Sequence, residues 1–283
     1  MITLKNTLLQ ISIVHPEDDS VLSGARYCHG CYIRQVEDLT KGALLSGPAY
    51  PDPSPDIFDG QGMPEAFESA LASYPSSKGD SVCVIGVGEV LRSSDHEPFH
   101  VRWNPEVLKR CIWDIQTTLC SVKMSTEQSF RGYHFILTKQ IQLNDWTVFS
   151  TTQINNIGPN PLPVKWFAHP FFPITKDMSC CKLSLPVTVP QNPGFFLRDD
   201  QFICMDPSYN WKNGCYRSLG IPWKKKLEAV VNHPAVAAIR IECSYAPTWL
   251  PIWANANTFS IEPFLAQTVT PGTETHWGIQ YTF

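Results

Sequence analysis

Three segments of this chain carry the side chains best suited to chemistry, and the first surrounds His169. This histidine lies in an aromatic-rich run, residues 164–172, and Pro170 follows it directly. Imidazole titrates near neutral pH, so a histidine held between a strand and a proline can donate or accept a proton. The neighbouring rings offer flat apolar surfaces to a ligand. The competing interpretation is a core histidine whose ring nitrogens are hydrogen-bonded.

The second segment, residues 258–265, contains Glu262. Its sequence, TFSIEPFL, predicts a strand with Phe259 and Ile261 on one face and Ser260 and Glu262 on the other. Glutamate is depleted in strands, so Glu262 either pairs with a cation, faces solvent or takes part in chemistry.

The third segment, residues 59–67, reads DGQGMPEAF and predicts a glycine-rich turn. Gln61 and Glu65 project from this turn, and both an amide and a carboxylate form hydrogen bonds with hydroxyl groups. On its own the segment is weak evidence for a site.

Taken in chain order, these segments resemble the aldose 1-epimerase (galactose mutarotase-like) family. The family has an Asn-containing turn before a strand that ends in His-Pro-aromatic-Phe, and this sequence has Asn155-Asn156 and then His169-Pro170-Phe171-Phe172. A strand with proline and aromatics, a Glu-Pro pair, a Pro-Gly turn and a final strand follow in the family. Their matches here are Tyr245-Ala246-Pro247 with Trp249 and Trp253, Glu262-Pro263, Pro271-Gly272 and residues 277–281. The resemblance covers residues 20–283 and is sharpest in the second half.

The resemblance implies a β-supersandwich with a hexose-binding cleft and no metal or organic cofactor. It assigns Glu262 as general base on the anomeric hydroxyl and His169 as general acid on the ring oxygen, so that ring opening, rotation and reclosure invert C1. It also implies further sugar-binding residues, which we assign to Gln61, Glu65, Arg34, Asp206 and Trp249. For the arginine, Arg26 is the alternative to Arg34, and for the aspartate, Asp199 and Asp200 are alternatives to Asp206.

One departure from the family pattern concerns proton transfer. The family has a histidine in a His-Gly-Gly turn, where this chain has Gly60-Gln61-Gly62. A glutamine amide can bind a hydroxyl group but cannot act as a proton-donating acid. His96 and His100 lie further along the chain and are candidates to take its place in space, but nothing in the sequence shows that either does so.

The elements that must position these residues are predicted from period-two alternation. It is clear in residues 133–143, where Lys139 interrupts an apolar face, and again in 239–245 and 277–283. The 24 prolines and 16 glycines cluster between such runs. Helical pattern is confined to residues 64–72 and 225–232. We therefore predict one domain over residues 1–283, all-β, built as a large antiparallel β-sandwich.

Composition narrows the classes of partner. With 22 basic and 26 acidic residues, the net charge of −4 does not favour nucleic acid. No run reaches the roughly 18 apolar residues of a membrane span, and the N-terminal segment predicts a strand rather than a signal peptide. These features predict a cytoplasmic protein. Its ten cysteines are expected to stay reduced, and Cys28 and Cys31 lack the second ligand pair of a zinc site.

The leading hypothesis is an isomerase, an aldose 1-epimerase acting on a sugar, or on a hexose 6-phosphate if an arginine or the Lys224–Lys226 cluster holds the phosphate. The alternative is a non-catalytic carbohydrate-binding protein on the same fold. A polysaccharide lyase ranks last because the sequence has no strongly basic cleft signature. The expected partner is a small sugar or sugar phosphate, and the expected state is a monomer or homodimer.

Overall fold

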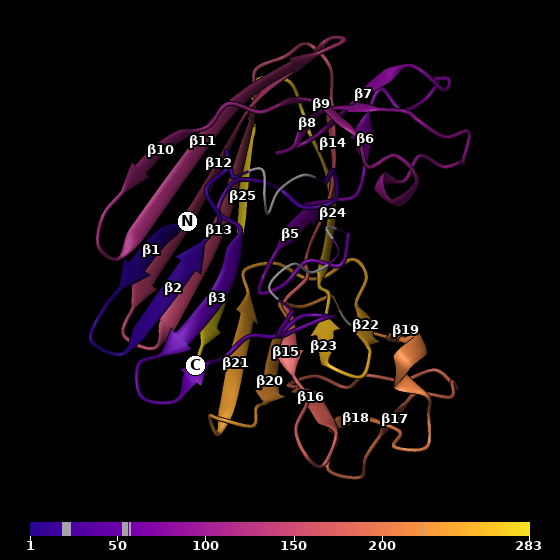
Figure 1. The fold of residues 1–283 in the computed structure, drawn as a ribbon. Helices are drawn as coiled ribbons and strands as arrows, with labels where there is room; N and C mark the ends of the chain where they lie inside the picture. Colours follow the sequence, from indigo (N-terminus) through magenta and orange to yellow (C-terminus); the bar gives the residue numbers. More distant parts are fainter. Residues whose placement is uncertain (19–23, 53–55, 57, 223) are drawn as a thin grey trace.

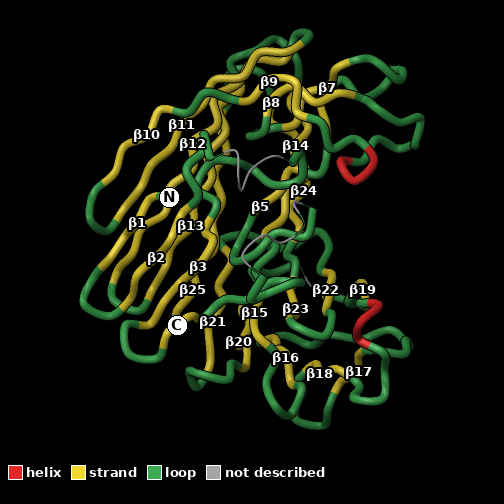
Figure 2. Tube along the Cα trace, in the orientation of Figure 1, coloured by secondary structure: helices red, strands yellow, loops and turns green. Residues whose placement is uncertain are grey.

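The computed structural model describes residues 1–18, 24–52, 56, 58–222 and 224–283. These residues form five antiparallel sheets and two short 3₁₀ helices, η1 (Val101–Trp103) and η2 (Trp211–Asn213), as Figures 1 and 2 show. The predicted all-β antiparallel architecture is confirmed.

The largest sheet has ten strands, and each runs antiparallel to its neighbours. In spatial order the strands are β10 (Asp114–Thr117), β11 (Ser121–Phe130), β12 (Tyr133–Asn144), β13 (Thr147–Asn156), β25 (Glu274–Thr282), β21 (Ala238–Cys243), β20 (Glu228–Asn232), β16 (Ser179–Leu183), β18 (Ile203–Met205) and β17 (Phe195–Leu197). The predicted alternation holds on β12, which buries Phe135, Leu137, Ile141 and Leu143 on one face together with Lys139.

Four smaller sheets complete the fold. The first contains β1 (Ile2–Lys5), β2 (Leu9–Ile13), β3 (Ile33–Asp38) and β4 (Gly42–Ala43). The second contains β24 (Phe264–Val269), β14 (Leu162–Ala168) and β5 (Glu65–Phe67). The third contains β15 (Phe172–Pro173), β23 (Thr258–Ile261), β22 (Pro251–Ala254) and β19 (Cys215–Ser218). The fourth contains β6 (Ala70–Leu71), β7 (Ser81–Val84), β8 (Gly88–Leu91) and β9 (Val107–Arg110).

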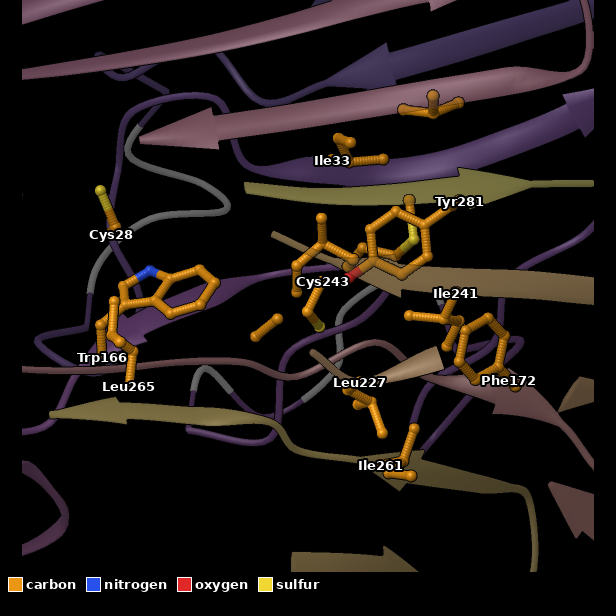
Figure 3. Packing of buried hydrophobic residues seen from close by; sticks show 14 of the residues in the cluster. Cys28, Ile33, Trp166, Phe172, Leu227, Ile241, Cys243, Ile261, Leu265 and Tyr281 are labelled. Carbon is orange, nitrogen blue, oxygen red and sulfur yellow. The ribbon is translucent and has the colours of Figure 1, made fainter. Parts of the chain in front are cut away.

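The main hydrophobic core joins side chains from all five sheets in one cluster. Figure 3 shows part of it, with Ile241 and Tyr281 from the ten-stranded sheet and Phe172 and Ile261 from the sheet that contains β23. Residues of β23 are buried on both faces, so this strand lies inside the molecule rather than on a solvated surface. The segment that leads to Glu262 is therefore held by packing on both sides.

The helical pattern expected in two segments is wrong. Residues 64–72 contain β5 and β6, and residues 225–232 contain β20. β5 pairs with β14, and β20 lies between β16 and β21. Short segments with weak local preference take the conformation for which neighbouring strands supply hydrogen-bond partners.

Two further observations bear on the nature of the protein. No helix in the described part of the chain is long and apolar enough to span a bilayer. The ten cysteines carry free thiols, and the described residues include no group of three or more His, Cys, Asp or Glu side chains placed to hold a metal ion.

Candidate functional site

His169 follows directly after β14, and the neighbouring backbone fixes its position. Its N–H donates a hydrogen bond to the carbonyl of Pro64 (2.8 Å). The preceding strand is held on both sides, by β24 and β5. The side chain is buried, with 3% of the residue exposed. His169 therefore sits where three segments distant in sequence meet.

Glu262 lies in the turn between β23 and β24. Its N–H donates to the carbonyl of Pro251 (2.9 Å), and the hydroxyl of Tyr245 donates to the carbonyl of Pro263 (2.8 Å). Only 4% of Glu262 is exposed. The solvated-face interpretation of this glutamate is therefore excluded.

The structure brings these two residues together. Nε2 of His169 lies 3.4 Å from Oε1 of Glu262. Aromatic rings surround the imidazole, with Phe171 at 4.4 Å and Tyr27 and Trp253 each at 6.2 Å between ring centroids. Nδ1 of His169 has no hydrogen-bond partner in the described part of the chain, so this is not a core histidine with both nitrogens satisfied.

Burial shifts the two pKa values in opposite senses. Burial raises the pKa of the Glu262 carboxyl to about 8; the charge of Arg26 opposes this shift and that of Glu68 adds to it. Burial, followed by the charge of Arg26, holds the pKa of His169 well below its usual value. Both shifts favour the uncharged forms at neutral pH, a protonated carboxyl beside a neutral imidazole, so the 3.4 Å contact joins two neutral groups rather than an ion pair.

Glu262 opens onto a cavity of about 190 Å³. Its polar lining residues are Arg26, Glu68, His100, Tyr216 and Glu262. Aromatic walls come from Phe58, Phe67, Phe167 and Phe264. The volume lies below the roughly 300–1,000 Å³ typical of sites for drug-sized ligands, so the cavity suits a small molecule such as one sugar ring.

The arginine that lines this cavity is Arg26, the alternative to Arg34, and the sugar-binding role of Arg34 stays a prediction. The Arg26 guanidinium lies 4.0 Å from the Phe58 ring centroid and donates to the Phe58 carbonyl (2.5 Å). Arg34 belongs to β3 and is not among the residues that line the cavity. The two arginines are eight positions apart, and only the path of the chain between them decides which one reaches Glu262.

Other protein groups occupy the carboxylate of Glu65, and this does not favour its predicted role in sugar binding. On β5 it pairs with Ala168 of β14, and its side chain points towards the ten-stranded sheet. There it forms an ion pair with the buried Lys139 and accepts hydrogen bonds from Ser150 Oγ (2.5 Å) and Trp166 Nε1 (3.1 Å). A carboxylate so fully engaged is not free to bind a sugar hydroxyl.

Asp206 does not line the cavity of Glu262, so its sugar-binding role finds no support there and stays a prediction. It follows β18, near one edge of the ten-stranded sheet. Its carboxylate accepts hydrogen bonds from the N–H (2.8 Å) and hydroxyl (2.6 Å) of Ser208. This is a local turn of the kind that aspartate commonly forms.

Gln61 and Trp249 lie near the site without lining the cavity of Glu262. The backbone N–H of Gln61 donates to the Tyr32 hydroxyl (3.0 Å), and the Tyr32 ring packs 5.9 Å from that of Tyr27. The Trp249 ring packs 4.6 Å from that of Phe264, one of the cavity walls. Their sugar-binding roles stay predictions.

Sequence reasoning missed two lining residues, Glu68 and Tyr216. Glu68 directly follows β5 and Tyr216 lies on the four-residue strand β19, and local pattern distinguishes neither of them. His100 was a candidate and does line the cavity. His96 is exposed and stacks on Trp103, with 5.5 Å between ring centroids.

Comparison with solved structures finds the same fold in mutarotase-like proteins. A galactose mutarotase related enzyme from Lactobacillus acidophilus matches with a TM-score of 0.61 and 12% identity, over 99% of this chain and 96% of its own. A galactose mutarotase-like protein from Lactobacillus casei matches with a TM-score of 0.57 and 13% identity, over 100% and 99% of the two chains.

A third structure, an aldose epimerase homologue from C. elegans, matches with a TM-score of 0.53 and 12% identity, over 99% of this chain and 97% of its own. No family model and no curated protein matches the sequence. At these identities the likeness concerns the fold, and the chain has the galactose mutarotase-like fold that the resemblance predicted.

Proposed function

We propose that this protein is an aldose 1-epimerase-type isomerase that interconverts the α and β anomers of a sugar. The observation that supports it most directly is the buried pair of His169 and Glu262, whose Nε2 and Oε1 atoms lie 3.4 Å apart. Mutarotation needs one group that takes a proton and one that gives a proton, and a singly protonated pair supplies both. No cofactor enters this chemistry.

Ring opening and closure then use the same pair in opposite directions. The base takes the proton from O1, the C1–O5 bond breaks with its electron pair on O5, and the acid protonates O5. After rotation about C1–C2, O5 returns its proton and attacks the other face of C1, while O1 regains a proton from the base. For Glu262 to act as the base, its proton first moves across to His169. The nearby charge of Arg26 favours the ionised carboxylate and disfavours the protonated imidazole.

The proposed substrate is an aldose with one sugar ring. The Lys224–Lys226 cluster does not support a phosphate at this site, because Lys226 lines a different cavity, beside Glu228 and Glu242 on the ten-stranded sheet. A hexose 6-phosphate would therefore depend on Arg26. The cytoplasmic location, the single domain and the monomeric or homodimeric state stay predictions from the sequence.

A non-catalytic carbohydrate-binding protein is the second candidate, and Gln61 favours it. The amide that occupies this position cannot donate a proton as an acid. Such a protein would keep the aromatic walls and the polar groups of the cavity but would not speed anomer exchange.

The test is the rate of anomer equilibration of glucose, galactose and their 6-phosphates, followed by polarimetry or NMR saturation transfer. The native protein is expected to accelerate it, and Glu262→Gln and His169→Asn are each expected to lower the rate at least about tenfold. Glu228→Gln, an exposed carboxyl change on β20, is the matched control. Binding without acceleration would favour the second candidate, and full activity in both site variants would refute the assignment.

A further inference from the structure

The segment around His100 turns its side chain towards the cavity of Glu262. Phe99 and Val101, on either side, pack into a hydrophobic cluster with the valines of β7 and β8, and both His100 and Val101 line the cavity. Two hydrogen bonds to the His100 carbonyl hold the backbone, one from the N–H of Trp103 (3.1 Å) and one from Nδ2 of Asn104 (2.9 Å). The imidazole is therefore carried by a well-anchored turn.

The hydrogen bonding of this ring assigns its proton. Nδ1 of His100 accepts a hydrogen bond from the N–H of Arg102 (3.1 Å) at the start of η1. A neutral imidazole carries one N–H, so the proton lies on Nε2. Burial lowers the pKa of His100, which keeps the ring in this neutral form at neutral pH. Nε2 forms no hydrogen bond within the described part of the chain.

Other charged groups of the cavity already have protein partners. Arg26 donates to the Phe58 carbonyl, and Glu68 forms an ion pair with Lys165. The Nε2–H of His100 is a donor without a hydrogen-bond partner in the described part of the chain, on the wall of the cavity that Glu262, the acid–base residue, also lines.

We propose that His100 is a substrate-binding residue that donates a hydrogen bond from Nε2 to an oxygen atom of the bound sugar. The ligand class rests on the proposed function, since an aldose presents hydroxyl and ring oxygens that accept such a bond. Glu262 contacts the same ligand from another part of the cavity wall. His100 binds and orients the ring, and the proton transfers stay with the His169–Glu262 pair.

The variant His100→Asn separates the proposed sugar-binding role of Nε2 from the structural role of Nδ1, which accepts the hydrogen bond of the Arg102 N–H. Asparagine is among the preferred residues at the start of a helix and accepts the Arg102 N–H bond, but it lacks the Nε2–H of imidazole. His96→Asn is the matched control, because His96 is exposed and stacks on Trp103 outside the cavity. We expect His100→Asn to raise the Kd for an aldose about three- to tenfold, which is the effect of one lost hydrogen bond. The midpoint of unfolding should stay unchanged.

The measurements are an NMR titration with glucose and galactose, the anomer-exchange rate, and ¹⁵N chemical shifts of the histidine rings. A protonated Nδ1 on His100 in the native protein would overturn the proposal, as would native affinity in His100→Asn or an equal loss in His96→Asn. If the native protein binds an aldose without accelerating its exchange, the isomerase function fails while the Kd comparison still decides the role of His100. If it neither binds nor accelerates any aldose, both proposals fail.

Discussion

Replacing Glu262 by glutamine is expected to make the protein less sensitive to alkaline pH. The folded-state pKa of this carboxyl is about 8, against an ordinary value of 4.5. Between these values the folded protein holds a proton that the unfolded chain has released, so the free energy of unfolding falls as pH rises. The stability present below the ordinary pKa is lost as pH rises towards the folded-state pKa.

The size of the effect follows from the shift. Each pKa unit corresponds to roughly 1.4 kcal/mol, so raising the pKa from 4.5 to about 8 amounts to a loss on the order of 5 kcal/mol over the whole window. Glutamine does not ionise, so the Glu262→Gln variant does not lose this stability as the pH rises. The difference in stability between Glu262→Gln and the native protein should therefore rise by this amount from acid to alkaline pH.

Urea unfolding of the native and variant proteins, from about pH 4 to about pH 9, measures this difference and cancels the contribution of other titrating groups. Glu228→Gln, which removes an exposed carboxyl on β20, is the matched control. Parallel stability curves for Glu262→Gln and the native protein would refute the reasoning, because they would mean that the Glu262 pKa is ordinary and that the pair does not hold a proton at neutral pH.

Two further predictions concern charged neighbours. Activity should fall above about pH 8 as the Glu262 carboxyl loses its proton. Arg26→Gln should move this alkaline limit to higher pH, and Glu68→Gln should move it to lower pH. Polarimetric rate profiles in which both variants move the limit in the same direction would contradict the electrostatic account. Lys139→Met should lower the free energy of unfolding by roughly 3–5 kcal/mol because it leaves the Glu65 carboxylate buried without its cation. The double variant Lys139→Met/Glu65→Gln should recover part of that loss in urea unfolding, and a double variant as unstable as the sum of the single changes would show that the two residues are not coupled.

Local sequence was enough to predict much of the sheet structure. Alternation along residues 133–143, 239–245 and 277–283 predicted strands, and β12, β21 and β25 occupy these regions. The pattern works because successive side chains on a strand face opposite sides, so a sheet with one buried face leaves its period in the sequence. The same alternation placed Lys139 on an apolar face. Only the structure explains why a lysine is buried there, because it shows the ion pair with Glu65.

The sequence by itself, through its resemblance to a family, selected His169 and Glu262 and the fold that carries them. Only the tertiary structure shows which other groups line the cavity of Glu262: Arg26 rather than Arg34, and His100 rather than His96. It also shows that Glu65 and Asp206 bind other protein groups. The physical reason is that the direction of a side chain depends on strand register and on the path of the connecting loops, and shifting the register of a strand by one residue moves its side chains to the opposite face. The pattern along one segment contains no information about the segments against which it packs.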